Sequence, residues 1–189
     1  MLIAICGKSG SGKSTIVKEL EELGYKRVVT DTTRPPRKGE KNEVDYYFDS
    51  EEQFMELLEE GEFLETTAYK VATGDIYRYG TSKGAIKEAG EKAVIMLNPM
   101  GLKAFRDRQI DMVAIYIDCN ERVLLSRLQE RGDLNSEIIR RMDTDNLDFE
   151  NIHSMIDGTV YNEKNTDIKK LAKTIVDLAE QIEENKLSN

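Results

Sequence analysis

A glycine-rich run that ends in Lys-Ser is the segment of this sequence best suited to bind a phosphate. Residues 7–14 read GKSGSGKS and fit the pattern GxxxxGKS. Glycines let consecutive backbone N–H groups turn toward one phosphate, and a helix that begins at the end of the run adds its dipole. An apolar stretch precedes the run and an amphipathic one follows it, which is the strand, loop and helix context that the motif requires. The run predicts a nucleotide phosphate site; a glycine-rich turn with a chance Lys-Ser pair is the alternative.

This motif assigns roles to individual side chains. Lys13 is expected to neutralise the β- and γ-phosphates of a bound nucleotide, and the Ser14 hydroxyl is expected to hold the Mg²⁺ that accompanies it. The other residues expected to contact these phosphates are Gly7, Ser9, Gly10, Ser11, Gly12 and Thr15. The loop alone does not identify the reaction, because GTPases, ATPases and small-molecule kinases share it.

A second set of anion-binding side chains lies downstream of the loop. Arg34 and Arg37 stand three positions apart in a proline-stiffened stretch, which makes a preorganised fork for a phosphate dianion, and nearby tyrosine hydroxyls could complete the cage. Solvated loop charges are the alternative for these arginines, and a core aromatic is the alternative for Tyr46. A further arginine cluster comprises Arg127, Arg131, Arg140 and Arg141.

The composition limits the kind of ligand. The 189-residue chain carries a formal net charge of −9, so most of its surface would repel a nucleic-acid backbone. Two small arginine clusters suit small phosphorylated molecules better. No apolar run is long enough to span a bilayer, and the apolar start is too short for a signal peptide, so we expect a cytoplasmic protein without a membrane partner. Cys6 and Cys119 are expected to be buried thiols without a disulfide.

Strand and helix patterns alternate along the chain and must position these residues. Strands are expected at residues 2–6, 25–30, 93–97, 112–117 and 158–161, and residues 63–79 are strand-like. Helices are expected at residues 15–23, 121–130 and 136–149, with Asp118 marking the start of the second. A further helix follows Ser50, where Gln53 completes a capping box. The alternation predicts an α/β domain with a mainly parallel sheet, whose ligands bind at the carboxyl ends of the strands.

Two more segments have a predicted place. Residues 31–44 are polar and contain prolines, so we expect a functional loop without regular structure. A C-terminal helix is expected to carry one apolar stripe, which packs against the sheet or, as the alternative, seats a dimer; its members are Ile168, Leu171, Ile175, Leu178 and Ile182.

Several motifs together resemble guanylate kinase. They are TTRPPRKGEKNEVDYYF from Thr32, FLE from Phe63, YGTS from Tyr79, and the later RLQERG and EIIRRM. They follow the family order over nearly the whole chain. The resemblance implies a three-layer P-loop kinase fold in a single domain, 1–189, with a core (1–30, 81–126 and 143–189), a GMP-binding insert (about 31–80) and a short lid (about 127–142). It also implies Mg²⁺-dependent transfer of the γ-phosphate of ATP to GMP and dGMP. The expected partners are these small-molecule nucleotides, and the protein is expected to be a monomer or a homodimer.

The resemblance carries family roles over to matching positions. It places Arg34, Arg37, Tyr46 and Tyr79 on the phosphate of GMP, with Thr30 where the family usually has a serine. Glu65 and Thr81 match the residues that read guanine, whose two adjacent donors suit a carboxylate; on sequence alone Glu65 could be a surface acid. Arg131 and Arg141 match the arginines that act with Lys13 on the transferred phosphate.

The sequence departs from the family at two places on the acceptor side. Asn98, Pro99 and Met100 stand where the family has Asp-x-Gln, so an amide replaces an acid among the expected GMP-binding residues. The stretch from Glu65 to Tyr79 is also longer than usual. These differences leave two alternatives to a GMP kinase: a kinase of the same fold for another nucleotide or a sugar phosphate, and an inactive binding module.

Overall fold

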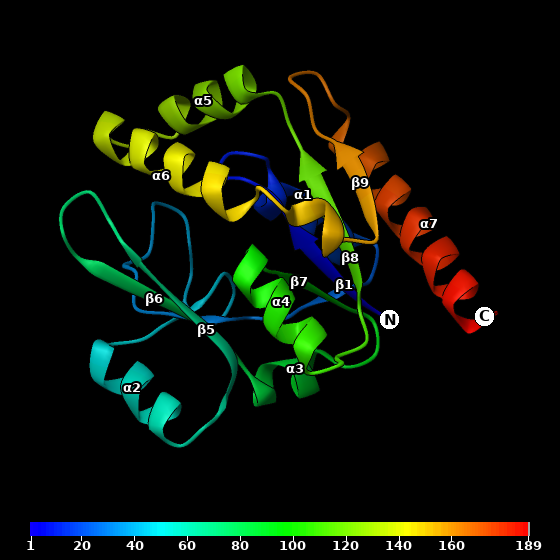
Figure 1. Cartoon of the computed structure of the whole chain (residues 1–189), viewed down its shortest axis with the longest axis horizontal. Coiled ribbons are helices and arrows are strands. Elements are labelled where there is room, and N and C mark those ends of the chain that lie inside the picture. Colours follow the sequence, from blue (N-terminus) through cyan, green and yellow to red (C-terminus); the bar gives the residue numbers. More distant parts are fainter. Residues whose placement is uncertain (189) are drawn as a thin grey trace. The chain divides into compact units, whose positions relative to one another are not determined.

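The computed structural model describes residues 1–188 and is a mixed α/β protein (Figure 1). Its contacts divide the chain into two compact units. The core unit comprises Met1–Arg27 and the chain from Glu91 onward, and the insert unit comprises Val28–Gly90. Each unit has a β-sheet of its own.

A five-stranded sheet in the order β2-β7-β1-β8-β9 forms the centre of the core unit, and all its neighbouring strands are parallel. The strands are β1 (Leu2–Cys6), β2 (Lys26–Arg27), β7 (Ala93–Met96), β8 (Val113–Asp118) and β9 (Gly158–Tyr161). β1 lies in the middle, and its carboxyl end leads directly into the glycine-rich loop. The predicted parallel sheet is therefore confirmed, and the loop starts where ligands bind in such sheets.

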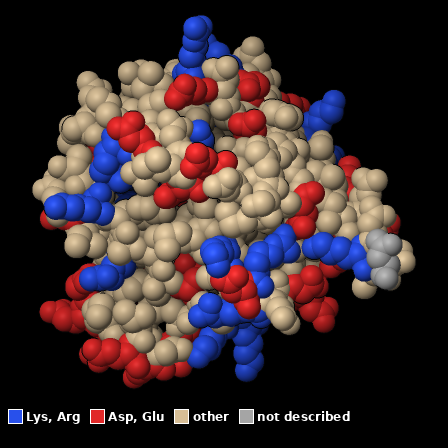
Figure 2. Space-filling model, viewed as in Figure 1, with Lys and Arg blue, Asp and Glu red and all other residues tan. Residues whose placement is uncertain are grey.

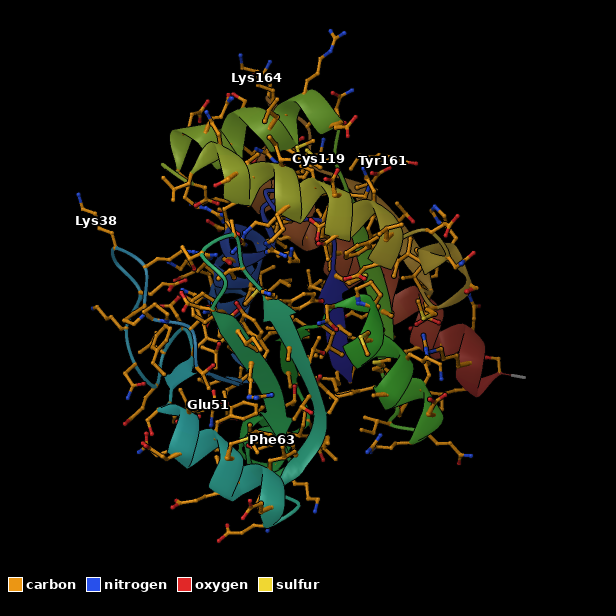
Figure 3. All side chains as sticks on the ribbon, turned by 60° about the vertical axis from the view of Figure 1, so that its left-hand side comes forward. Lys38, Glu51, Phe63, Cys119, Tyr161 and Lys164 are labelled. Atoms are coloured by element: carbon orange, nitrogen blue, oxygen red, sulfur yellow. The ribbon has the colours of Figure 1, made fainter. Side chains whose placement is uncertain are left out.

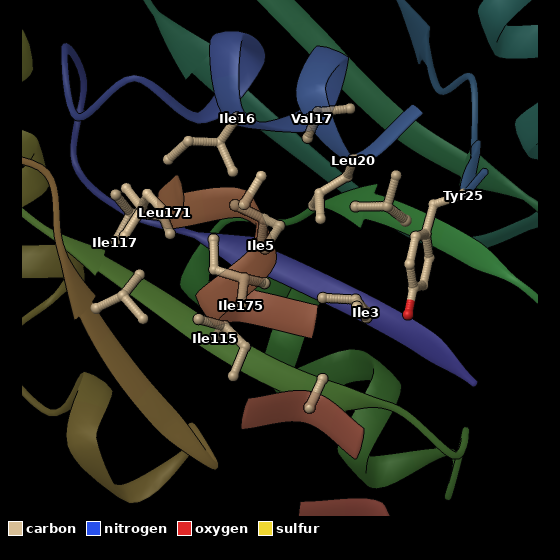
Figure 4. Close-up of a cluster of buried hydrophobic side chains, with 14 of the residues drawn as sticks. Ile3, Ile5, Ile16, Val17, Leu20, Tyr25, Ile115, Ile117, Leu171 and Ile175 are labelled. Carbon is tan, nitrogen blue, oxygen red and sulfur yellow. The ribbon is translucent and has the colours of Figure 1, made fainter. Parts of the chain in front are cut away.

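Alternate residues of the central strands point into one apolar core (Figure 4). Two helices cover this face of the sheet, α1 (Lys13–Glu22) and α7 (Ile168–Leu187), and they contact each other. The fully buried members of the core include Ile3, Ile5, Ile16, Val17, Leu20, Ile115, Ile117 and Ile175. Because Leu171 and Ile175 belong to it, the apolar stripe of α7 packs against the sheet.

The other helices of the core unit are α4 (Pro99–Asp107), α5 (Glu121–Glu130), α6 (Asn135–Asp148) and the short 3-10 helix η1 (Ile152–Ser154). α5 and α6 lie side by side in Figure 1. The bounds of α5 are as predicted, but Asn120 caps it by accepting a hydrogen bond of 3.0 Å from the Arg122 N–H. Asp118 is still part of β8, so the prediction that it marks the start of this helix is wrong.

The insert unit has a four-stranded sheet in the order β4-β3-β6-β5. Its strands are β3 (Asp31–Thr32), β4 (Tyr47–Phe48), β5 (Phe63–Lys70) and β6 (Ile76–Ser82). β5 and β6 form an antiparallel hairpin, which confirms that residues 63–79 are strand-like. Helix α2 (Glu51–Glu59) begins with the predicted capping box of Ser50 and Gln53. Helix α3 (Lys83–Ala89), which the sequence patterns did not predict, is capped by the Ser82 hydroxyl.

Two predictions for the segment in which the chain passes from the core unit into the insert unit were wrong. A strand was expected over residues 25–30, but only Lys26–Arg27 pair with β7, because the chain enters the insert unit at Val28. The stretch 31–44 was expected to lack regular structure, but Asp31–Thr32 pair with both β4 and β6. The backbone groups of this short strand are satisfied by residues distant in sequence, which a local pattern cannot show.

The surface carries both signs of charge, and basic side chains are interspersed with acidic ones on the face that Figure 2 shows. Both cysteines are free thiols; Cys6 is buried as predicted, whereas Cys119 is partly exposed. Within residues 1–188, none of the helices combines the length and the apolar character that crossing a membrane requires.

Candidate functional site

The glycine-rich loop wraps around the ammonium group of Lys13. Gly12 precedes α1 in a left-handed conformation, with a φ of 93°, and Lys13 is the first residue of the helix. Lys13 Nζ donates to the carbonyl oxygen of Gly7 at 2.6 Å and to that of Lys8 at 3.1 Å. Burial lowers the pKa of this ammonium, and the nearby negative charge of Asp145 opposes the effect. The loop therefore holds a partly buried cation beside backbone N–H donors, which is a site for an anion.

The outer side of the loop is fixed by a residue that follows β9 and by an arginine of α5, neither of which had been predicted to hold the loop. Asn162, which follows β9, donates from Nδ2 to the Ser11 carbonyl at 2.8 Å. Arg127 donates to the Gly10 carbonyl at 3.3 Å. A Cβ at Gly12 would lie 2.3 Å from Asn162 Nδ2, so this close approach requires glycine. These contacts turn the carbonyls of Gly10 and Ser11 outward, whereas the Ser11 N–H donates to the Lys8 carbonyl within the loop at 3.1 Å.

Both predicted catalytic arginines act on the charge of Lys13. The positive charges of Arg131 and Arg141 both lower the pKa of Lys13. Arg131, at the end of α5, pairs with Asp133, and Arg141 of α6 donates from Nε to Glu137 at 2.7 Å. The same Glu137 accepts from Arg140 at 2.8 Å. The charges of Arg131 and Arg141 thus both act on Lys13, and two acids, Asp133 and Glu137, orient the arginines.

Helix α6 also touches the loop directly. Asp145 accepts a hydrogen bond of 2.5 Å from the Ser9 N–H at Oδ2. In the next position, Asn146 accepts from Lys8 Nζ at 2.6 Å. Sequence reasoning missed both residues because the contacts join positions more than one hundred residues apart.

Ser14 is the residue predicted to hold magnesium. It is exposed, and its hydroxyl lies 3.8 Å from the Met96 sulfur, which is a weak partner. Magnesium bound to a nucleotide keeps several waters and takes one or two protein oxygens, so one hydroxyl beside the phosphate loop fits the ion. Among the described residues, no group of three or more His, Cys, Asp or Glu could hold a metal without such a nucleotide.

In the insert unit, one acid organises the predicted arginine fork. Arg34 is 95% buried, its side chain being 5% exposed, and it is bound to Glu40 at 2.9 and 3.0 Å. Arg37 donates its backbone N–H to the same carboxylate at 2.7 Å. Burial alone would raise the pKa of Glu40, but the hydrogen bonds from Arg34 and Arg37 lower it below its usual value. Sequence reasoning missed Glu40, although an acid so near two arginines was a usable signal. Lys38, between the arginines and Glu40, points outward in Figure 3.

Two predicted tyrosines lie beside this fork. The guanidinium carbon of Arg34 stands 5.4 Å from the centre of the Tyr46 ring, and the rings of Tyr46 and Tyr79 meet edge to face at 6.3 Å. Tyr46 is only partly buried, which speaks against the core-aromatic alternative. The structure therefore brings Arg34, Arg37, Tyr46 and Tyr79 together, as a phosphate site requires.

The two residues predicted to read guanine face each other across the hairpin. Glu65 of β5 and Thr81 of β6 are register partners, and the Thr81 hydroxyl donates to Glu65 Oε1 at 2.6 Å. Thr81 is fully buried and Glu65 is partly buried, so Glu65 is not a solvated surface acid. Of the other expected acceptor residues, Thr30 uses its carbonyl to accept from the Tyr47 N–H at 2.9 Å. Asn98 belongs to the core unit, where its side chain caps α4 by accepting from Gly101 at 2.7 Å.

A buried pair of acids in the insert unit was not predicted. Asp31 in β3 is buried and Asp49, just after β4, is partly buried, and among the described residues neither Oδ2 atom has a hydrogen-bond partner. Burial, followed by the charge of Asp49, raises the pKa of Asp31 from 3.8 to about 7. Burial also raises the pKa of Asp49. The pair therefore retains a proton over part of the neutral range.

Comparisons with known proteins agree on one family. The family model described as Guanylate kinase matches residues 1–183. A guanylate kinase of Clostridioides difficile (strain 630) is 36% identical over 197 aligned positions, which cover 100% of this chain and 90% of that protein. A guanylate kinase of Schizosaccharomyces pombe is 34% identical over 158 positions, covering 78% of this chain and 75% of that protein.

A solved structure shares the fold. The crystal structure of guanylate kinase from Anaplasma phagocytophilum superposes with a TM-score of 0.69 at 24% identity, covering 95% of this chain and 85% of that one. This likeness confirms the predicted P-loop kinase fold. From the family match over residues 1–183 and the identity to curated relatives, this chain belongs to the guanylate kinase family.

Proposed function

We propose that this protein transfers the γ-phosphoryl group of ATP to GMP, and to dGMP, giving ADP and GDP or dGDP. The observation that carries the proposal is the position of Lys13, which lies in the phosphate loop within reach of the charges of Arg131 and Arg141. A transferred phosphoryl group needs compensation of negative charge on several sides, and these three cations supply it.

The core unit binds the donor in this proposal. The N–H groups of the loop and Lys13 hold the β- and γ-phosphates, while Arg131 and Arg141 compensate the charge of the group in flight. Magnesium, held by the Ser14 hydroxyl together with ATP, would supply further charge neutralisation at the phosphates. Asp133 and Glu137 keep the arginines in a small set of conformations, which reduces the ordering cost when a substrate binds.

The insert unit binds the acceptor. Arg34, Arg37, Tyr46 and Tyr79 hold the phosphate of GMP, whose oxygen is already anionic and needs no general base to attack. The one histidine of the chain agrees with this, because His153 lies in the core unit, where its ring meets that of Tyr116 edge to face at 6.0 Å.

Guanine recognition falls to Glu65 and Thr81. A carboxylate can accept hydrogen bonds from both N1–H and the exocyclic amine of guanine, whereas adenine offers an acceptor at N1. Binding adenine would leave partly buried polar groups unpaired, which can discriminate by ~10⁴. The hydroxyl of Thr81 fixes one oxygen of Glu65 and so orients the carboxylate.

A coupled assay with ATP and a panel of acceptors tests the proposal. We expect turnover with GMP and dGMP, and at least ~10²-fold lower kcat/KM with AMP, CMP, UMP and sugar phosphates. Activity with another acceptor but none with guanine nucleotides would show that the acceptor is assigned wrongly. Calorimetry with ATP and Mg²⁺ tests the alternative of an inactive binding module. Such a module should not bind ATP and should therefore give no heat.

A further inference from the structure

The phosphate loop already contacts an anion that belongs to the protein. The carboxylate of Asp145 accepts the Ser9 N–H at 2.5 Å, and its charge acts on Lys13. Ser9 is one of the loop residues assigned to the phosphates of ATP. Chemically, a carboxylate oxygen on a loop N–H beside a lysine stands where a phosphate oxygen would be held.

Asp145 lies on α6, the helix that also carries Arg141. Glu137, Arg141 and Asp145 follow one another at intervals of four, so they share one face of the helix. Arg141 also acts on the charge of Lys13, and Asn146 binds Lys8 on the same loop. The C-terminal half of α6 is therefore fastened to the loop by two neighbouring contacts.

The charges around Lys13 explain why an acid occupies this place. Lys13, Arg131 and Arg141 put three positive charges near one another, and Asp145 is the acid whose charge most favours the charged form of Lys13. With a bound triphosphate the balance reverses, because the phosphates supply the negative charge and Asp145 becomes a like charge beside them.

We propose that Asp145 is an internal anion that occupies the phosphate loop when no donor is bound, holds α6 against it, and competes with the phosphates of ATP. Binding of ATP then requires Asp145 to leave Ser9, which frees the helix that carries Arg141. The proposal rests on the donor part of the proposed function only, so it does not depend on which acceptor is used.

The charge of Asp145 can be removed with little change in shape. In Asp145→Asn we expect the Kd of Mg²⁺-ATP and of inorganic pyrophosphate, measured by calorimetry without acceptor, to fall by about tenfold. Asp145→Glu keeps the charge and should bind like the unmutated protein. Asp143→Asn is the matched control, because it removes the same charge from an exposed position on the same helix and should leave both Kd values unchanged.

A second measurement separates competition from a structural or metal-binding role. The ligand-free Asp145→Asn protein should melt at a lower temperature because it loses the charged loop contact, yet pyrophosphate should raise its Tm by more than it raises that of the unmutated protein. Unchanged or weaker binding in Asp145→Asn overturns the proposal.

A measurement on the unmutated protein covers the case in which the variant does not fold. In NMR spectra of the unmutated protein, the amide resonance of Ser9 and the carboxyl resonance of Asp145 should both shift as pyrophosphate is added. A carboxyl resonance that does not respond overturns the proposal. If Asp145→Asn binds ATP more tightly as expected but the unmutated protein does not phosphorylate GMP, only the assignment of the acceptor is wrong.

Discussion

Arg34 and Arg37 belong to one motif but do different work. Arg34 is almost fully buried and bound to Glu40 through both terminal nitrogens. The side chain of Arg37 is 34% exposed and lies 4.0 Å from the same carboxylate. Arg34 is thus part of the framework of the loop, whereas Arg37 can reorient toward a ligand at lower cost.

This difference predicts that alanine substitutions at the two arginines have different effects on KM and on stability. Arg37→Ala should raise the KM for GMP by roughly 10–100-fold, the loss of a charged hydrogen bond, with little change in the free energy of unfolding. Arg34→Ala should raise KM and also destabilise the protein, because Glu40 is left without its buried partner. Steady-state kinetics and urea unfolding measure both. The exposed Lys38→Ala is the control, and equal effects of Arg37→Ala and Lys38→Ala would remove Arg37 from the site.

Glu65 offers a prediction on selectivity. Glu65→Gln keeps the size of the side chain but replaces one acceptor oxygen with an NH₂ group, which faces a donor of guanine. The kcat/KM for GMP should fall by about 10²-fold or more, while that for AMP should not fall, so the ratio collapses. Parallel assays with GMP and AMP measure it. A variant that lost both activities equally would point to a structural role for Glu65.

How far the site could be predicted depends on how far apart its contacts lie in the sequence. Lys13, Arg34 and Glu65 were predicted as site residues because motifs mark them. Glu40 and Glu137 were missed, although each lies within a few positions of an arginine that it holds. Asp145 and Asn162 could not be found in this way, since the fold alone brings them to the loop.

At the scale of elements, β3 and the end of β4 place two acids together. The pKa of Asp31 is raised to about 7 by burial and by Asp49, so the folded protein keeps a proton that the unfolded chain releases near pH 4. A group of this kind contributes most stability below its unfolded pKa, and that contribution is lost as the pH rises to about 7.

The expected result is a fall in stability between about pH 4 and pH 7, on the order of 4 kcal/mol, that levels off above neutrality. Asp31→Asn should flatten this part of the profile, because an amide has no proton to lose. Urea unfolding at several pH values measures the free energy of unfolding of the unmutated protein and of Asp31→Asn. Glu40, whose lowered pKa makes stability change with pH in the opposite direction, contributes equally to both proteins and cancels in the difference. Parallel profiles would mean that the pair does not share a proton.

The same segment shows why some elements were mispredicted. Val28 and Val29 continue an apolar pattern that resembles a strand, yet the chain leaves the parallel sheet after Arg27. Asp31 and Thr32 look like loop residues, yet they pair on both sides. Long, continuous runs such as β1 and β8 were predicted well because burial on both faces leaves a local signal, and two-residue strands leave none.

At the scale of the whole molecule, the residues proposed to bind the donor and those proposed to bind the acceptor belong to separate units. Lys13, Arg131 and Arg141 belong to the core unit, whereas Arg34 and Glu65 belong to the insert unit. The alternation of strands and helices predicted the fold class. The bounds of the insert unit, Val28 and Gly90, depend on contacts that link distant residues, so no local pattern could fix them.

This division predicts that each substrate protects its own unit from hydrogen exchange. A ligand stabilises the parts that it binds, by an amount that grows with its concentration over its Kd. Pyrophosphate alone should therefore slow exchange in α1 and in the loop before it, and GMP alone should slow exchange in β3, β5 and β6. Peptide-resolved exchange, followed by mass spectrometry at saturating ligand, makes the measurement. AMP is the matched control for GMP, because it has the same phosphate but should protect β5 and β6 less when Glu65 and Thr81 read the base. If GMP alone protected the phosphate loop and left the insert unit unchanged, Arg34, Arg37, Glu65 and Thr81 would have to be reassigned.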